Sequence, residues 1–323
     1  MNLRLRGFAA ERSMGFSPLS FRWLVTAALL LCVVLAGDAR VSGAGQSHLD
    51  DKKPVPLRWN PPQVDKPIDS LSPTPPCVLP DILKQTSSRA TDLISNLQNF
   101  DAHEHVRYEE TDETGIPDVA TVARGDYDYV VDFINKPPNL VTRETRTPIG
   151  DGSADLSNVI DRGLPSLALI FHPFLSDDYD MTCEGYGEWD GKAAWVIHFR
   201  QKKDKKPRTL ALKTSTAGYS VALKGRAWVA ADSGEIMHLE TNLVAGIGLL
   251  HLLGNAVSID YAPVQFHSQS VTVWLPQSAV AYSDYGKKRA IISHTFSDFK
   301  LFSVQTQQQI EKPKEAPELP KPQ

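Results

Sequence analysis

The stretch YSVALKGRAWVAADSGEIMHLETNL, residues 219–243, decides the fold class of this 323-residue chain. Its alternating pattern predicts two β-strands, residues 219–230 and 235–243. The Ala-Asp-Ser-Gly sequence at residues 231–234 predicts the turn between them. Long strands joined by tight polar turns recur along much of the chain. The sequence therefore predicts a mainly β (α+β) protein with a large antiparallel sheet.

Within the first predicted strand, apolar side chains alternate onto one face: Val221, Leu223, Ala227 and Val229. Gly225 interrupts them, and a glycine inside a strand often marks a bulge or a bend. Both faces become apolar around Trp228, so we expect this part of the strand to be covered on both sides. In the second strand, Met237 and Leu239 form the apolar face.

One long helix is predicted at residues 81–99. An apolar stripe at helical spacing runs along it: Ile82, Ala90, Leu93, Ile94 and Leu97. Asp81 places a carboxylate in the first turn, where the helix dipole favours negative charge. We expect this helix to pack against the sheet.

Further strands are predicted at residues 102–109, 127–133, 140–146, 179–187, 192–200, 257–261, 264–267, 270–274, 280–282, 290–295 and 299–304. Asp190-Gly191 is the clearest hairpin signal, because glycine tolerates the positive φ of a primed turn. Pro263 and Pro276 are expected to interrupt strands. Residues 166–171 predict a short apolar helix. Residues 247–253 predict either a short helix under the sheet or a plug in its mouth.

The two ends of the chain differ from its middle. Four arginines precede an apolar run at residues 23–37, which is short for a membrane span but typical of a secretory signal. Small residues follow, so cleavage is expected after Ala39 or Ala44, and an uncleaved membrane anchor is the alternative. Residues 40–76 are rich in proline and are expected to be a disordered tether. Residues 77–304 are expected to form one domain, followed by a disordered tail at residues 305–323.

Export changes the interpretation of the cysteines. After signal removal only Cys77 and Cys183 remain, an even pair in an oxidising compartment such as the periplasm. We predict a disulfide between them that holds the first helix to the sheet. Two buried free thiols are the alternative.

Several classes of function have no support in the sequence. The net charge is −4 and no basic stripe is present, which argues against nucleic-acid binding. His103 and His105 share a strand face but lack partner ligands for a metal site. Glu184, Glu188 and Asp190 lie near a hairpin turn, where carboxylates are usually solvated. No catalytic residues, metal site or cofactor are predicted.

The predicted strands carry more apolar surface than one helix can cover. The sheet is therefore expected to curl around its own interior or around an apolar ligand. Six residues are the candidates for lining such a ligand site: Trp195, Val221, Leu223, Trp228, Met237 and Leu239. Ordinary core packing is the alternative interpretation of each.

The segment LKGRAWVAADSGEIMHLET, residues 223–241, resembles the paired strands of the periplasmic lipoprotein-carrier and lipoprotein-sorting superfamily. Residues 274–304 are similar to the strands that follow there. Four segments more closely resemble a family of exported acidobacterial proteins: CVLPDILKQTSSRATDLISNLQNF, CEGYGEWDGKAAWVIHFRQ, LKGRAWVAADSGEIMHLETNLV and HTFSDFKLFSV. The resemblance implies an eleven-stranded antiparallel half-barrel with helices on its concave side, whose relatives bind acyl chains. No position aligns with the ligand-binding arginine of the carriers.

Together these observations predict an exported, non-catalytic protein of the cell envelope. Its expected ligand is a lipid or an acyl chain in the concavity of the sheet. The alternative is a structural module with a fully packed core that binds other envelope proteins. Membrane association is expected only through an uncleaved N-terminal segment.

Overall fold

The computed structural model describes residues 57–136, 139–150, 156, 163–213, 218–266 and 271–301. The chain divides into two units, Met1–Lys53 and Pro54–Gln323, and every described residue belongs to the second. The expected leader and the expected tail therefore lie outside the described residues. Among the described helices, none combines the length and the apolar character that a membrane crossing requires.

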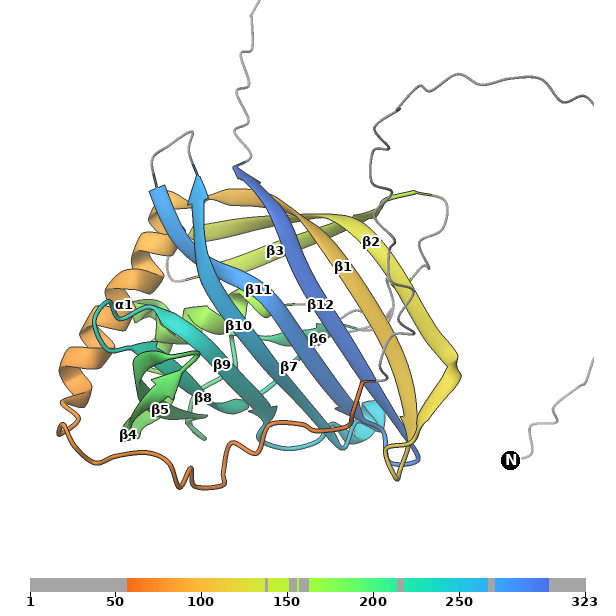
Figure 1. Ribbon diagram of the computed structural model, residues 1–323, viewed down its shortest axis with the longest axis horizontal. Coiled ribbons are helices and arrows are strands. Elements are labelled where there is room, and N and C mark those ends of the chain that lie inside the picture. The colour runs from red at the N-terminus through yellow and green to blue at the C-terminus, as the bar shows by residue number, and fades with distance from the viewer. Residues whose placement is uncertain are drawn as a thin grey trace, which may run out of the picture. The chain divides into compact units, whose positions relative to one another are not determined.

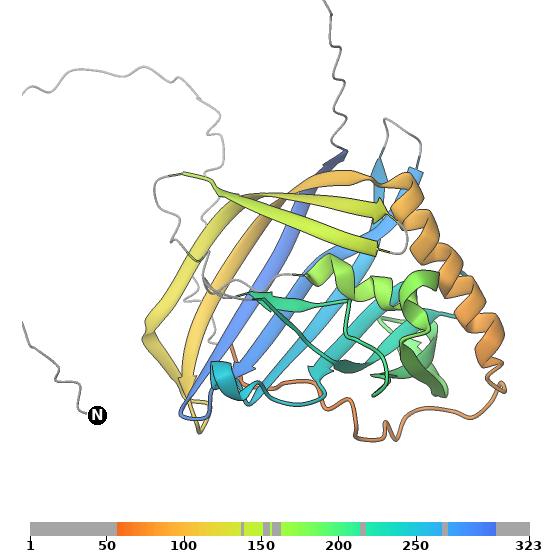
Figure 2. The same ribbon diagram turned by 180° about the vertical axis from the view of Figure 1, so that it is seen from behind.

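Helix α1 (Leu79–Asn96) confirms the predicted long helix. Proline lies in its first turn, where a missing N–H costs no helical hydrogen bond. The buried face carries Ile82, Thr86, Ala90 and Ile94. Figure 2 shows α1 lying across one end of the sheet, beside the short helices.

Ten antiparallel strands form one sheet in the order β3-β2-β1-β12-β11-β10-β9-β8-β5-β4. The sheet curves strongly but stays open, with β3 and β4 at its edges (Figure 1). This confirms the predicted half-barrel, with ten strands where the resemblance implied eleven. The strands are β1 (Asn99–Asp112), β2 (Pro117–Lys136), β3 (Asn139–Pro148), β4 (Tyr179–Trp189), β5 (Lys192–Gln201), β8 (Leu223–Ala230), β9 (Ile236–Leu243), β10 (Gly254–Phe266), β11 (Val271–Asp284) and β12 (Lys288–Leu301). A separate pair consists of β6 (Ala211–Lys213) and β7 (Gly218–Ser220).

The concave face is covered by three short helices: α2 (Leu164–Leu167), η1 (Ala168–Phe171) and α3 (Pro173–Ser176). We call residues 164–176 the inner segment; it lies within the curve of the sheet in Figure 2. Every residue of α2 and η1 is buried. Their apolar side chains join the main core together with the inward faces of the strands. The short apolar helix predicted at residues 166–171 is thus present and fills the concavity.

The β8–β9 hairpin confirms the predicted turn at residues 231–234, where Gly234 has a φ of 73°. The first predicted strand is divided, because residues 218–220 pair with β6 before β8 begins. The bulge lies between Trp228 and Val229 rather than at Gly225. Gly225 serves close packing instead: a Cβ there would lie 2.3 Å from the ring of Phe199.

Strands β10 and β11 run through the prolines that were expected to interrupt them. β10 pairs with β9 only as far as Asp260, so Pro263 lies where that neighbour has ended. β11 pairs with β12 only from Ser278 onward, so Pro276 also lies beyond its neighbour. A proline is tolerated where no ladder hydrogen bond is required of its nitrogen. The end of the β10–β11 hairpin (residues 261–266 and 271–276) is therefore bonded to no strand on either side within the described sheet.

Residues 57–76 differ from the disordered tether expected there. They form an extended segment, which we call the strap, along the outer side of the sheet (Figure 1). Val64 is buried, and Ile68 and Leu71 pack on the small cluster around Trp228. Hydrogen bonds from Arg226 and Asn242 to strap carbonyls fix its path. Val64, Ile68 and Leu71 lie four and three residues apart, but the prolines in this segment argue against the helix that this spacing would indicate, so the composition predicted a tether.

Residues 247–253 are neither a buried helix nor a plug. They form a loop with one short turn, η2 (Gly248–Leu250), closed by pairing between Ile247 and Leu252. Leu249 is 81% exposed and Leu253 is 66% exposed. The loop closes on itself at the end of the strands; Leu252 is buried in the core, and Ile247 and Leu250 pack against it half-buried.

The predicted disulfide is present, with 6.5 Å between the Cα atoms of Cys77 and Cys183. It joins the residue two positions before α1 to β4, so it holds the start of the helix at the edge of the sheet.

We expect replacement of both cysteines by serine to lower the free energy of unfolding by about 4–5 kcal/mol. The cysteines are 106 residues apart, and releasing a loop of this length restores that much chain entropy to the unfolded state. Urea unfolding of the oxidised protein and of the double variant measures the difference. Reductant should destabilise the parent protein and leave the variant unchanged. Labelling of Cys77 and Cys183 by a thiol reagent in denaturant without reductant would contradict the bond.

Candidate functional site

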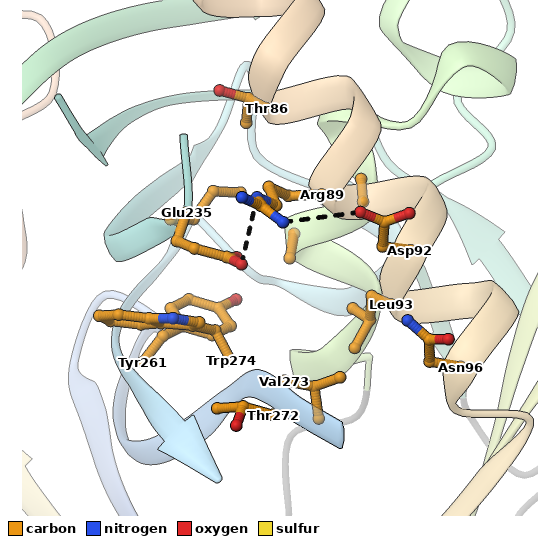
Figure 3. Close-up of a pocket in the computed structure, with 13 residues that line it drawn as sticks. Thr86, Arg89, Asp92, Leu93, Asn96, Glu235, Tyr261, Thr272, Val273 and Trp274 are labelled. Atoms are coloured by element: carbon orange, nitrogen blue, oxygen red, sulfur yellow. Dashed lines mark ion pairs between the residues drawn. The ribbon is translucent and has the colours of Figure 1, made fainter. Parts of the chain in front are cut away.

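A cavity of about 100 Å³ lies between α1, the start of β9 and the end of the β10–β11 hairpin (Figure 3). We call it the α1 cavity. Its apolar walls come from α1, from Ala168 of the inner segment and from the strands: Ala90, Leu93, Ile236, Val273 and Trp274. The unbonded end of the β10–β11 hairpin forms one side of it.

Charged side chains lie at the mouth of this cavity. The Nε atom of Arg89 lies 3.5 Å from Oε1 of Glu235 and donates a hydrogen bond of 2.9 Å to the carbonyl of Ser233. Its Nη1 atom lies 3.7 Å from Oδ2 of Asp92. Figure 3 shows both ion pairs above the apolar walls. One arginine is thus shared between two carboxylates.

Glu235 is electrostatically unusual. Burial disfavours its charged form and raises the pKa of this carboxyl from 4.5 to about 7, although Arg89 acts in the opposite direction. Perturbed carboxylates in a cleft are frequent at functional sites. At neutral pH Glu235 therefore exchanges a proton readily, and the charge at the mouth changes with it.

Tyr261 also lines the cavity, and its hydroxyl is buried without a hydrogen-bond partner within the described residues. Burial raises the pKa of this phenol above its usual value, so the group stays neutral. An unsatisfied buried hydroxyl costs roughly 1–3 kcal/mol. A ligand atom or a water in the cavity would recover that energy.

The volume limits what the cavity holds in this conformation. About 100 Å³ corresponds to roughly three waters, whereas small-molecule sites usually measure about 300–1,000 Å³. The cavity therefore accepts the end of a chain or a small polar group. A longer ligand requires the β10–β11 hairpin or the inner segment to move.

A second polar group lies on the concave side, fully buried. Glu104 accepts a hydrogen bond of 3.0 Å from Nη2 of Arg146 and lies 2.8 Å from Nδ1 of His294. Burial alone would raise the pKa of Glu104, but the bonds to His294 and Arg146 hold it below its usual value. Arg146 also lies 4.4 Å above the ring of Tyr129.

This buried group connects the sheet to the inner segment. Arg146 pairs with Glu144, whose other oxygen accepts the backbone N–H of Gly163, immediately before α2. Glu104, Glu144 and Arg146 are all nearly inaccessible. We interpret the group as a structural anchor, since each of its charges is already paired.

The six residues predicted to line a ligand site are not brought together. Val221, Leu223 and Leu239 are buried in the main core, and Trp195 packs at its edge against the ring of Tyr186. Trp228 and Met237 belong to a smaller cluster on the opposite face. Trp228 faces away from the main core by ordinary alternation with Ala227 and Val229. Met237 joins it because the bulge leaves Met237 unpaired between His238 and Ile236. None of the six lines the α1 cavity.

Sequence reasoning missed the residues that do line it, among them Arg89, Glu235, Tyr261 and Trp274. They come from a helix, a turn and the two strands of a hairpin. The only local signal was the pair of prolines, Pro263 and Pro276, which mark where lateral pairing ends.

Three of the other polar candidates, His103, His105 and Glu184, have structural partners. His103 and His105 both contact Asp126. Glu184 forms a bidentate pair with Arg226 under the strap. Across the described ranges, no group of three or more His, Cys, Asp or Glu side chains is arranged to hold a metal ion.

The sequence matches no protein-family model and no curated protein. Similar solved structures include a DUF1329 family protein from Desulfovibrio piger, with a TM-score of 0.36 and 10% identity over 68% of this chain and 92% of that one. A protein described as an outer membrane lipoprotein-sorting domain, from Vibrio parahaemolyticus, has a TM-score of 0.30 and 10% identity, over 71% and 95%. Lipoprotein LppX of Mycobacterium tuberculosis has a TM-score of 0.24 and 14% identity, over 68% and 96%.

All three TM-scores lie below 0.5. The strand pairing of this chain itself defines its fold.

We expect the stability contributed by Glu235 to be present in full below pH 4.5, the ordinary pKa of the group, and to be lost as the pH rises to about 7. In that window the unfolded chain releases the proton while the folded protein retains it. The free energy of unfolding therefore falls by at most about 1.4 kcal/mol per pH unit. Glu235→Gln should therefore gain stability relative to the parent between pH 5 and pH 8, measured by urea unfolding. Glu113→Gln, at an exposed position, is the control. A pH-independent difference for Glu235→Gln would contradict the raised pKa.

We expect Arg146→Leu to destabilise the protein by about 3–5 kcal/mol, because it leaves Glu104 buried without its cation. Arg143→Leu is the matched control, since Arg143 lies on the same strand and is exposed. Thermal and urea unfolding of both variants measure the effect. Equal stability of the two variants would show that the buried group is not an anchor.

Proposed function

We propose that this protein is an exported, non-catalytic protein of the cell envelope that binds the apolar chain of a lipid or acyl ligand through the α1 cavity. The observation that carries the proposal is the composition of this cavity. Apolar side chains line its interior and Arg89 is the one cation among its lining residues. This arrangement suits the end of an apolar chain inside and a polar or anionic group at the mouth.

Two further features support this function. The unpaired hydroxyl of Tyr261 offers a hydrogen bond inside the cavity. The end of the β10–β11 hairpin has no ladder to a neighbouring strand in the described sheet, so it can move without breaking one. Movement of this hairpin would enlarge the cavity toward the volume that an acyl chain needs.

A structural module that binds other envelope proteins is the second candidate. It is favoured by the packing of the concave side, where the buried side chains of the inner segment occupy the space that a large ligand would take: Leu164, Leu167, Leu169, Ile170 and Phe171. We propose the periplasm as the compartment in either case. Attachment to a membrane would then depend on whether residues 23–37 are retained.

The test uses delipidated protein and a fluorescent fatty acid. We expect saturable binding that Ala90→Leu weakens at least tenfold, because the larger side chain fills most of the cavity while staying on the buried face of α1. Ser88→Leu adds the same side chain at an exposed position of that helix and should bind like the parent. Arg89→Gln should weaken binding of the fatty acid more than it weakens binding of the uncharged methyl ester.

Absence of binding by the delipidated parent would contradict the proposed function. Native mass spectrometry of protein purified without detergent provides a separate readout. A lipid mass that is lost on denaturation supports a carrier, whereas a bare mass with co-purified envelope proteins supports the packed module.

A further inference from the structure

A second, larger hollow lies on the face of the sheet opposite the main core. We call it the outer cleft; its volume is about 520 Å³, within the usual range for a small-molecule site. The β4–β5 hairpin forms one wall and the β10–β11 hairpin forms the other. The side chains that define its chemistry are Glu188, Trp189, Asp190, Lys192, Asp260 and Trp274.

One wall of the cleft is rigidly built. The ring of Trp189 stacks on that of His238 with 3.7 Å between centroids, and Trp228 contacts both. Nδ1 of buried His238 lies 2.8 Å from Oδ1 of Asp260. The other carboxylate oxygen of Asp260 accepts a bond of 3.2 Å from Ser278. Asp260 is thus held in place, yet its side chain remains 51% exposed.

The charge of the lining is negative. Glu188, Asp190 and Asp260 contribute three carboxylates, against Lys192 in the lining and His238 behind Asp260; burial acts to lower the pKa of His238, but its bonds to Asp260 and Glu240 raise it. The bonds from His238, Ser278 and Trp189 hold the pKa of Asp260 below its usual value, which keeps it ionised. Glu188 and Asp190 form no ion pair within the described residues. The cleft therefore attracts cations and repels anions.

The face of Trp274 already holds a cation from the chain itself. The Nζ atom of Lys192 lies 5.3 Å from the centroid of this ring. An indole face is the strongest aromatic partner for an ammonium group, and recognition of quaternary ammonium ligands uses such rings. Lys192 is an exposed residue beside the turn between β4 and β5, so it can leave the ring at little cost.

We propose that the outer cleft binds an organic ammonium cation, with its charge over the ring of Trp274 and near the carboxylates of Asp260 and Glu188. Lys192 acts as an internal competitor that occupies the same ring when no ligand is present. This site differs from the proposed apolar-chain site because it selects for positive charge, although the two hollows share Tyr261 and Trp274. A neutral ligand would gain no electrostatic attraction from the excess of carboxylates in the lining.

The test is a titration of the full protein with choline. Binding is monitored through the indole N–H resonances of the tryptophans in NMR spectra. The neutral isostere 3,3-dimethyl-1-butanol, which has the same shape without the charge, is the matched ligand control. Choline should shift the resonance of Trp274, identified by its loss in Trp274→Leu, and the isostere should bind at least tenfold more weakly. Trp274→Leu should weaken choline binding by about five- to thirtyfold.

Two exposed positions keep the test independent of folding. Lys192→Gln should tighten choline binding by about two- to fivefold, because it removes the competing ammonium. Glu188→Gln should weaken it by a similar factor through the lost charge. Lys203→Gln, an exposed lysine outside the cleft, is the control and should change nothing. Equal binding of choline and its isostere, no choline binding by any variant, or unchanged affinity in Lys192→Gln would each overturn the proposal. Fatty-acid binding is measured separately on the same samples. A negative result for one site therefore does not decide the result for the other.

Discussion

The structure depends on keeping water away from the concave face of a sheet that does not close. Ten strands present one long apolar inner surface, and α1 covers only one end of it. The inner segment supplies the remaining cover, and every residue of α2 and η1 is buried. Its position is fixed at its start by the bond from Gly163 to Glu144, and through Arg146 to Glu104 in the sheet. The buried group of Glu104, Glu144 and Arg146 therefore fixes the position of the apolar inner segment on the sheet.

The two sites lie where this arrangement is least continuous. Strands β9 and β12 stop pairing before the β10–β11 hairpin ends, and two prolines mark the change. Trp274 and Tyr261 lie on this hairpin and line both the α1 cavity and the outer cleft. The two hollows thus share a wall that is one hairpin thick. A shift of that hairpin would alter both volumes together, which gives a physical route for one site to influence the other.

Local chemistry made much of the fold predictable. Helix α1, the turns at residues 190–191 and 231–234, the alternation in β8 and β9 and the even pair of cysteines each follow from short patterns with a known physical cause. The strap was not predicted because its few apolar residues lie among prolines, a composition typical of a disordered tether. Pro263 and Pro276 predict breaks in strands, because a sequence does not reveal that a strand has lost its lateral neighbour.

The sites were less accessible to sequence reasoning than the fold. Arg89, Glu235, Tyr261 and Trp274 meet only after the helix, the turn and the hairpin have packed, and nothing in their local sequences links them. Of the six predicted lining residues, Trp228 lies on the outer face by ordinary alternation, and Met237 lies there because the bulge in β9 changed the phase at that residue. Met237 lines the outer cleft, where no ligand site was expected.

The pairing of β1 with β12 has a consequence for how the chain matures. The first strand of the sheet has the last strand as its neighbour, with Phe100 opposite Leu301. The strap, still earlier in the chain, binds Arg226 and Asn242, which follow its own contact residues by 160 and 180 positions. Contacts this distant in sequence form slowly, because a long loop must close before they yield any stabilisation. Strand β1 and the strap therefore lack their full set of partners until β12 and β9 have been made, so the complete sheet is assembled late.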